Sequence, residues 1–417
     1  MGRFETAADH GRIYVELDAQ GNTWLFNVKP RAISLAVDGS ENYTFDREGR
    51  PYAAFVEGRN YRRGMDGCVL VKHRHEPGGR AVRVMSQLDA GGTGWFLYRV
   101  RQRLDELAAA VARNAPELNP DQQSLLQAWL ARLRRWDAAA LQADVGRFHS
   151  LYQRVSILPP DQYLALVVQS SEGCPWNRCT FCQLYRDRRF RHKSGDELAR
   201  HVHGIVEWLG EGLWLRRSVF LGDANLLWGS AARLAEVLSS VNDYLTAVGG
   251  PAGAFYGFAD AAGVLRHQTD QLQVLRRLGL RRVYLGLETG HDALLRHLNK
   301  PGSAVDMVRA VRHLHASGLQ VGVIVLLGVG GTAQAEPHER DTVHTLHAMD
   351  LGAGDIIYFS PLMRHDEPDC SRDSCQPGAE TMDYAAMRQQ QQRMAAGLRF
   401  AAARPSMSLY DIRDFVY

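Results

Sequence analysis

Three of the six cysteines in this 417-residue chain, Cys174, Cys179 and Cys182, lie close together in the sequence. Their C-x4-C-x2-C spacing follows an apolar run at residues 164–168 that predicts a strand. Three thiolates in one loop can bind three irons of a cubane [4Fe-4S] cluster, which leaves the fourth iron open to another molecule. A zinc site and incidental thiols are the alternatives, but the nearest histidine, His192, lies ten residues beyond the last cysteine.

The other three cysteines are too few for the four protein ligands of a second closed cluster. Cys68 adjoins an apolar run and is expected to be a buried, inert thiol. Cys370 and Cys375 form a C-x4-C pair in a polar loop beyond the last predicted barrel strand. We predict one cluster per chain. Cys370 and Cys375 are then expected to stay a pair of thiols outside any cluster. They are either redox-active, bind a thiophilic group of the substrate, or have no role.

The composition is that of an ordinary globular protein. Hydrophobic residues make up 45% and charged residues 23%, which excludes a disordered chain, a fibre or a collagen. The sequence contains no run of about 18 apolar residues, so no transmembrane helix is expected. The first residues lack the apolar segment of a secretory signal, so a cytoplasmic location is expected. A net charge of +3 is too small to indicate nucleic acid or an anionic membrane as a partner.

Strands that alternate with helices must position the cysteine loop. Beyond the first strand, apolar runs that predict strands occur at residues 219–221, 254–258, 282–287, 321–327 and 355–359. Ser194 and Glu197 form a capping box at the start of the first intervening helix. The alternation predicts a parallel sheet with right-handed crossovers. Six such units favour an open α/β barrel with its site at the C-terminal ends of the strands.

The chain is expected to have three regions. Residues 1–150 combine short apolar runs with later helical patterns, which predicts an accessory α+β domain. Residues 151–365 contain the barrel pattern. Residues 366–417 are expected to form a C-terminal loop and helical extension.

The cysteine loop resembles that of the radical S-adenosylmethionine (radical SAM) superfamily. Its members usually have C-x3-C-x2-C after the first strand and an aromatic residue before the third cysteine, the position of Phe181 here. The longer first gap is similar to that of one branch of the family. The resemblance covers residues 164–361, with a weaker likeness at residues 410–417. It implies a partial (β/α)6 TIM-like barrel, a [4Fe-4S] cluster on Cys174, Cys179 and Cys182, and SAM as the second cofactor.

The resemblance also implies where SAM binds near the first two strands. Phe181 would lie against the adenine, although packing inside the barrel explains it equally well. Gly222, Asp223 and Asn225 end the second strand, where the family binds the methionine amino group. The glycine permits close backbone approach, and the two polar side chains could accept hydrogen bonds from an ammonium. Helix capping is the alternative role for Asp223.

Two later strand ends complete the implied SAM site. Glu288 ends the fourth strand inside an apolar run, where the family contacts the ribose or the carboxylate of SAM. A buried salt bridge is the alternative role for this side chain. Gly328 and Gly330 follow the fifth strand and would let backbone groups reach the nucleobase. Glycines in an ordinary turn would give the same pattern.

The resemblance implies an enzyme in which the reduced cluster cleaves SAM and the 5′-deoxyadenosyl radical removes hydrogen from a small-molecule substrate. Oxidoreductases, lyases and transferases share this chemistry. An electron donor such as flavodoxin or ferredoxin is implied as a partner. Radical SAM modification of RNA is one alternative, and a non-enzymatic iron–sulfur or zinc protein is another. The basic run at residues 186–193 could bind an anionic substrate or RNA, but local salt bridges on a solvated loop explain it more simply.

Overall fold

The computed structural model describes residues 4–7, 12–19, 21–75, 82–113, 120–363, 381–400 and 403–417. The chain divides into two compact units. The N-terminal unit comprises residues 1–154, 203–217 and 413–417, and the C-terminal unit comprises residues 155–202 and 218–412. Cys370 and Cys375 lie outside the described residues. No helix in the described ranges is both long and apolar enough to cross a membrane.

The N-terminal unit contains a nine-stranded antiparallel sheet whose strands follow one another in chain order. The strands are β1 (Phe4–Ala7), β2 (Arg12–Ala19), β3 (Asn22–Val28), β4 (Ile33–Val37), β5 (Glu41–Phe45), β6 (Pro51–Val56), β7 (Arg59–Arg63), β8 (Val69–His75) and β9 (Val82–Gln87). Three helices follow, α1 (Ala90–Arg113), α2 (Pro120–Arg134) and α3 (Ala138–Leu151).

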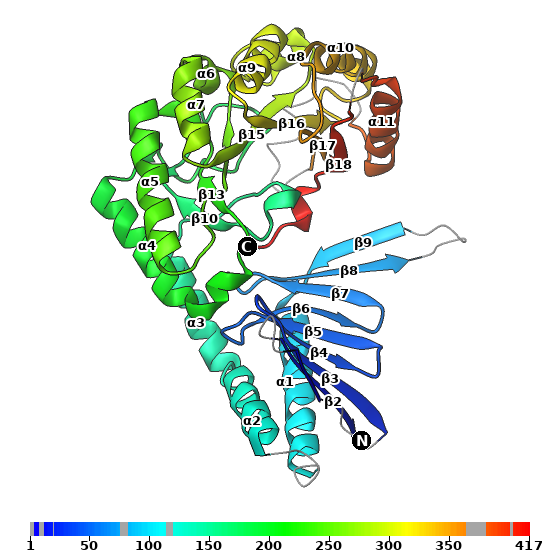
Figure 1. Ribbon diagram of the computed structural model, residues 1–417. Coiled ribbons are helices and arrows are strands. Elements are labelled where there is room, and N and C mark those ends of the chain that lie inside the picture. The colour runs from blue at the N-terminus through cyan, green and yellow to red at the C-terminus, as the bar shows by residue number, and fades with distance from the viewer. Residues whose placement is uncertain are drawn as a thin grey trace. The chain divides into compact units, whose positions relative to one another are not determined.

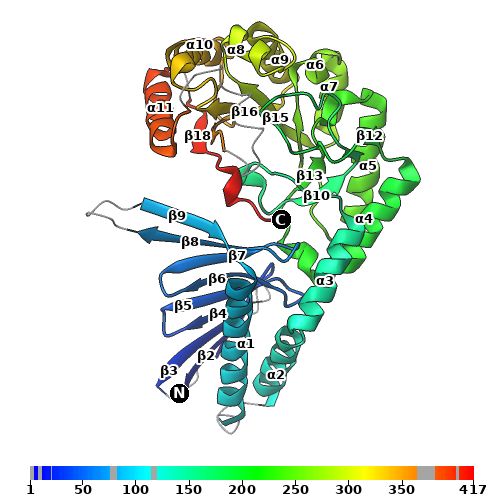
Figure 2. The same cartoon turned by 180° about the vertical axis from the view of Figure 1, so that it is seen from behind.

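One face of this sheet carries the core of the unit. Alternate side chains of β3, Trp24, Phe26 and Val28, are buried, as expected for a strand with one covered face. They belong to the same apolar cluster as Phe96 and Leu104 of α1. Figure 2 shows α1 lying across the sheet. Burial of these apolar surfaces therefore joins the helix to the sheet.

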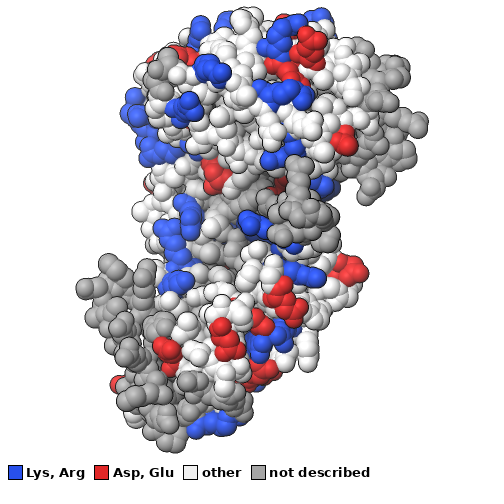
Figure 3. Space-filling view, turned by 90° about the vertical axis from the view of Figure 1, so that its right-hand side faces the viewer, with Lys and Arg blue, Asp and Glu red and all other residues white. Residues whose placement is uncertain are grey.

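Ion pairs also link α1 to the sheet. Glu41 of β5 accepts hydrogen bonds from Arg99 at 2.6 Å, Arg103 at 2.8 Å and Tyr43 at 2.7 Å. Burial opposes ionisation of Glu41, but these hydrogen bonds outweigh it and lower its pKa to about 2. Figure 3 shows basic and acidic side chains next to one another in the lower half of the view.

The C-terminal unit contains a seven-stranded parallel sheet. Its strands are, in spatial order, β10 (Leu166–Gln169), β13 (Val219–Gly222), β14 (Phe255–Ala259), β15 (Leu280–Glu288), β16 (Gln320–Leu327), β17 (Ile356–Pro361) and β18 (Ser406–Leu409). The first six confirm the predicted strands of the α/β barrel. The sequence did not predict the seventh, β18, which pairs with β17 from Ile356↔Ser406 to Phe359↔Leu409.

Helices surround this sheet on the outside, as Figure 1 shows. They are α4 (Gly195–Leu209), α5 (Ala231–Ala247), α6 (Ala261–Leu265), α7 (Thr269–Arg277), α8 (Asp292–His297), α9 (Ala304–Ala316), α10 (Ala335–Ala348) and α11 (Tyr384–Gly397). The predicted capping box at the start of α4 is confirmed. The Ser194 N–H donates to Glu197 at 2.7 Å, and the Glu197 N–H donates to the Ser194 hydroxyl at 3.2 Å.

A short two-stranded ribbon closes the base of the cysteine loop. β11 (Ser171–Glu172) pairs antiparallel with β12 (Arg191–His192). Lys193 and Arg191 both form ion pairs with Glu172 across this ribbon. Residues 173–190 therefore form one closed loop that leaves the C-terminal end of the first barrel strand.

Candidate active site

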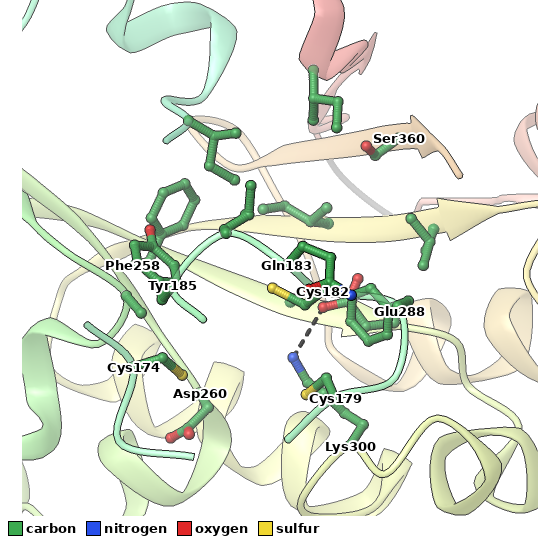
Figure 4. Close-up of a pocket in the computed structure, with 18 of the residues that line it drawn as sticks. Cys174, Cys179, Cys182, Gln183, Tyr185, Phe258, Asp260, Glu288, Lys300 and Ser360 are labelled. Carbon is green, nitrogen blue, oxygen red and sulfur yellow. Dashed lines mark hydrogen bonds and ion pairs between the residues drawn. The ribbon is translucent and has the colours of Figure 1, made fainter. Parts of the chain in front are cut away.

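The three clustered cysteines line one cavity at the C-terminal ends of the barrel strands. The cavity has a volume of about 210 Å³, and Phe181 also lines it. Figure 4 shows the side chains of Cys174, Cys179 and Cys182 around this space. Phe181 also packs against the buried apolar cluster of Leu298 and Leu326. The loop thus brings together the four residues that the sequence singled out in it.

Hydrogen bonds hold the cysteine loop in place. The indole N–H of Trp176 donates to the Asn299 carbonyl at 2.8 Å, and the Thr180 N–H donates to the Leu298 carbonyl at 3.0 Å. Gly173 has a φ of 76°, and a Cβ there would lie 2.9 Å from the Arg189 carbonyl oxygen. Only glycine fits such a conformation and approach without strain. The loop is therefore anchored to the segment after α8, and its start at Gly173 packs against its end at Arg189.

The surroundings of the thiols disfavour free thiolates. Burial raises the pKa of Cys179 to about 12, and the charge of Lys300 only partly opposes this. Burial also raises the pKa of Cys182. A bound metal centre reverses this preference, because its positive charge deprotonates coordinating thiols. Cys179 and Cys182, which lie on the same loop as Cys174, therefore fit a metal cluster as ligands.

A single metal ion would need its ligands close to one centre. In the described ranges no three His, Cys, Asp or Glu side chains converge closely enough to hold one metal ion. A zinc ion would require thiolates about 2.3 Å from a common centre. In a cubane cluster each cysteine binds a different iron, so its ligands are more widely spaced. The zinc alternative thus gains no support from the described residues.

Glu288 reaches the cavity because the end of β15 is irregular. The pairing of β15 with β16 shifts register between Gly286 and Glu288, and Glu288 has a φ of 60°. A bulge of this kind re-aims a side chain, and such strained backbone is concentrated at functional sites. The result is a carboxylate that lines the cavity although it lies inside an apolar strand.

Lys300 forms a buried ion pair with Glu288. The distance from Lys300 Nζ to Glu288 Oε1 is 2.9 Å, with 13% and 9% of the two side chains exposed (Figure 4). Burial disfavours the charged lysine, but the charge of Glu288 and its hydrogen bond with Lys300 outweigh it and raise the pKa of Lys300. Gly286 makes room for the pair, since a Cβ there would overlap Glu288 Oε1 and lie 2.9 Å from Lys300 Nζ. The salt bridge considered for Glu288 is thus present, and it lies inside the cavity.

The residues at the end of β13 separate into two groups. Asn225 lines the cavity, and its buried Oδ1 has no hydrogen-bond partner among the described residues. Asp223 does not belong to the lining. Its carboxylate accepts a hydrogen bond from the Gly173 N–H at 2.9 Å and pairs with Arg188 at 3.1 Å. Gly222 also lies outside the lining, and its carbonyl accepts a hydrogen bond from Ser171.

Gly328 and Gly330 turn toward helices. A Cβ on Gly328 would collide with Met387 of α11, and the Gly328 N–H donates to Gln390 of the same helix at 2.8 Å. A Cβ on Gly330 would collide with Gln334. Neither glycine lines the cavity. Contacts of Gly222, Asp223, Gly328 and Gly330 with SAM stay predictions.

Several cavity residues were missed by the sequence analysis. Lys300 and Asp260 supply the other charged groups of the described lining. Asp260 follows β14 and caps α6 by accepting a hydrogen bond from the Gly263 N–H at 2.6 Å. A polar residue directly after a barrel strand was a sufficient signal for Asp260. Lys300 follows a helix and gives no comparable signal.

Residues 168–339 match the family model of the Radical SAM superfamily. They form a radical SAM domain. The match includes the cysteine loop, Asn225, Glu288 and Lys300. It confirms the predicted radical SAM resemblance for this part of the chain.

Known proteins resemble parts of the chain. An anaerobic magnesium-protoporphyrin IX monomethyl ester cyclase from Synechocystis is 25% identical over 205 residues, which are 47% of this chain and 35% of that protein. The chain thus spans about a third of the length of this curated relative.

Two of the solved structures that match the chain are partly similar to it. Coproporphyrinogen III oxidase from Escherichia coli has a TM-score of 0.42 and 13% identity, over 63% of this chain and 56% of that one. Methylornithine synthase has a TM-score of 0.40 and 17% identity, over 61% and 66%. Both TM-scores are below 0.5, so the likeness is partial.

Proposed function

We propose that this radical SAM domain holds a [4Fe-4S] cluster on Cys174, Cys179 and Cys182 and cleaves SAM reductively beside it. The observation that carries the proposal is that three thiols of one loop line the same cavity as Asn225 and the Glu288–Lys300 pair. A cluster bound there would supply the electron that splits SAM into methionine and a 5′-deoxyadenosyl radical, and that radical would remove hydrogen from a small-molecule substrate.

The polar side chains of the cavity suit the charges of SAM. Asn225 Oδ1 is a buried acceptor with no partner among the described residues, which suits the ammonium of the methionine part. Glu288 and Asp260 bring negative charge to a site that must hold a sulfonium cation. Lys300 lines the same cavity and can donate to the carboxylate of SAM. Its ammonium has three N–H donors, and the contact with Glu288 uses one of them. Each charged part of SAM therefore has a complementary group.

The remaining wall of the cavity is mainly apolar. Its apolar members include Ile157, Leu184, Phe258, Ile324, Leu326, Pro361, Leu362, Met363 and Ile412, and its polar members include Gln183, Tyr185, Ser360 and Tyr410. Apolar walls exclude water and so protect a reactive intermediate. We infer a small substrate with a substantial apolar surface. RNA fits less well, because Lys300 is the sole Lys or Arg among the described lining residues and is paired with Glu288.

The test is the formation of 5′-deoxyadenosine from SAM. The protein is reconstituted anaerobically with iron and sulfide, reduced with dithionite, and incubated with SAM in the presence and absence of cell metabolites. Mass spectrometry should detect 5′-deoxyadenosine with the wild type and none above background with Cys179→Ala. A wild type that carries the cluster but forms no more product than Cys179→Ala under both conditions would contradict the proposal.

A further inference from the structure

Helix α10 presents a largely buried polar face to the end of β15. Four residues at positions i, i+3, i+4 and i+7 share that face, namely His338, Asp341, Thr342 and Thr345. His338 and Thr342 are fully buried, and Thr345 is 5% exposed. A helix face that packs against the core is normally apolar, because unpaired polar groups are costly there. These four residues, the polar face of α10, must therefore be satisfied by neighbouring polar groups.

The polar face of α10 binds the segment that directly follows β15. His338 Nδ1 forms a hydrogen bond with the Thr289 hydroxyl at 2.7 Å, and the same hydroxyl accepts a hydrogen bond from the His291 N–H at 3.0 Å. The Gly290 N–H donates to the Thr342 hydroxyl at 2.9 Å. Side chains of α10 therefore fix a segment that lies beyond the last paired residue of β15.

Close packing supports the same attachment. A Cβ on Gly290 would overlap the Asp341 carbonyl oxygen and lie 2.5 Å from the Thr345 hydroxyl. The Asp341 carboxylate also pairs with His291 Nδ1 at 2.7 Å. Only glycine allows the backbone to approach the helix this closely. The segment after Glu288 therefore lies directly on α10.

Glu288 needs such a restraint because its backbone is strained. Its φ of 60° is sparsely populated for a residue with a Cβ, and such a conformation persists only where the surroundings hold it. Burial lowers the pKa of His338 to about 4, so the ring is neutral at neutral pH. A neutral ring can hold Thr289 without the cost of a buried charge. The polar face of α10 thus supplies a restraint beside the strained residue.

We propose that His338 is a positioning residue that acts through Thr289 to hold the Glu288 carboxylate in the cavity. The inference rests on the proposed function, in which the Glu288–Lys300 pair binds SAM. Neither His338 nor Thr289 lines the cavity, so their effect on SAM must pass through Glu288. Without the hydrogen bond to His338, the strand end can relax to a negative φ and turn the carboxylate away from Lys300.

The test is calorimetry of SAM binding to the reconstituted full chain. His338→Phe keeps an aromatic ring but removes its hydrogen bonds, and Thr289→Val removes only the hydroxyl. Both should weaken SAM binding at least about fivefold, whereas Thr289→Ser keeps the hydroxyl and should bind within about twofold of the wild type. In a Glu288→Gln background, His338→Phe should change the affinity by less than about twofold, because its effect passes through Glu288. His315→Ala is the control, since His315 pairs with Asp355 at the opposite end of the barrel strands and should leave SAM affinity unchanged.

A second measurement needs neither cluster nor SAM. Hydrogen exchange of the cluster-free protein follows the Gly290 and His291 amides, whose acceptors His338→Phe leaves in place. We expect exchange at least about tenfold faster in this variant and unchanged in His315→Ala.

Each contrary result identifies what has failed. Wild-type SAM affinity in both His338→Phe and Thr289→Val overturns the positioning role and leaves the proposed function intact, and faster exchange alone would then mark a merely structural contact. An equal loss of affinity in the Glu288→Gln background also overturns it, because His338 would then act by another route. A wild type that carries the cluster but binds no SAM overturns the proposed function and the positioning role together.

Discussion

The Glu288–Lys300 pair allows the sharpest quantitative prediction. At 2.9 Å and an effective dielectric constant of about 20, the attraction between the two charges is about 6 kcal/mol before desolvation is subtracted. Breaking a buried pair by removing one partner typically costs about 3–5 kcal/mol, because the other charge stays buried and unpaired. Glu288→Gln and Lys300→Met should each lower the stability of the cluster-free protein by about this amount. The double variant should lose about 1–3 kcal/mol less than the sum of the two.

Hydrogen exchange provides the assay, because it reports the opening of individual strands. Peptides that cover β15 and β16 give the opening free energy next to the pair in each variant. Arg309→Gln is the control, since its ion pair with Asp306 is exposed and should contribute no more than about 1 kcal/mol. Additive losses within about 0.5 kcal/mol in the double variant would show that the two side chains do not interact.

The same variant tests the role of Glu288 toward SAM. Loss of one charge-assisted hydrogen bond costs about 1.5–3 kcal/mol, or roughly ten- to a hundredfold in affinity. Calorimetry on cluster-loaded Glu288→Gln should therefore show weaker binding of SAM. Unchanged affinity would leave Glu288 with a structural role only.

Three further predictions concern other residues. Gly286→Ala should weaken SAM binding by at least about tenfold, because the added Cβ displaces the Glu288–Lys300 pair. Gly146→Ala in α3 is the control, since a Cβ there meets nothing within 4 Å and should leave SAM affinity unchanged. An equal change of SAM affinity in the two variants would be evidence against a role of the pair in binding. Glu41→Gln should cost about 3 kcal/mol at pH 7, because the folded-state pKa is lowered from 4.5 to about 2. The stabilisation by ionised Glu41 is present above pH 4.5 and is lost as the pH falls toward 2. The free energies of urea unfolding of the wild type and Glu41→Gln should therefore converge at low pH. A difference between them that stays constant with pH would contradict the lowered pKa of Glu41. Replacing Cys370 and Cys375 with Ala should leave iron at about four per chain, and a fall from about eight to four would reveal a second cluster.

Local patterns predicted the parts of the site that lie within one short segment. The three cysteines and Phe181 share one loop, so their spacing alone placed them together. Glu288 was recognisable because a carboxylate at the end of an apolar strand is costly unless it has a partner. The strands of the barrel could be predicted from the sequence because parallel strands are covered on both faces and so form continuous apolar runs.

Long-range contacts decided what the sequence did not predict. The carboxylate of Asp223 is engaged by Arg188 and Gly173, which lie 35 and 50 residues earlier in the sequence, and the sequence did not predict these contacts. Lys300 reaches Glu288 only because the turn after α8 folds back over the strand end. Gly328 faces Met387 and Gln390, which lie about 60 residues later in the chain. None of these partners is marked by spacing or periodicity.

The seventh barrel strand shows the same limit. β18 has the sequence Ser-Met-Ser-Leu, which lacks the apolar run of the other barrel strands. It is a strand because its backbone pairs with the edge of β17. The N-terminal sheet was predicted only as short apolar runs in an α+β domain, since the pairing of its nine strands depends on contacts between them and not on any single run.

Metal analysis of the reconstituted protein tests the central claim most directly. The account predicts about four irons and four sulfides per chain for the wild type and for the control Cys68→Ala, which lies outside the cavity. The triple variant Cys174→Ala/Cys179→Ala/Cys182→Ala should lose both iron and sulfide. A triple variant that retains the wild-type stoichiometry would contradict the assignment of the cluster to this loop.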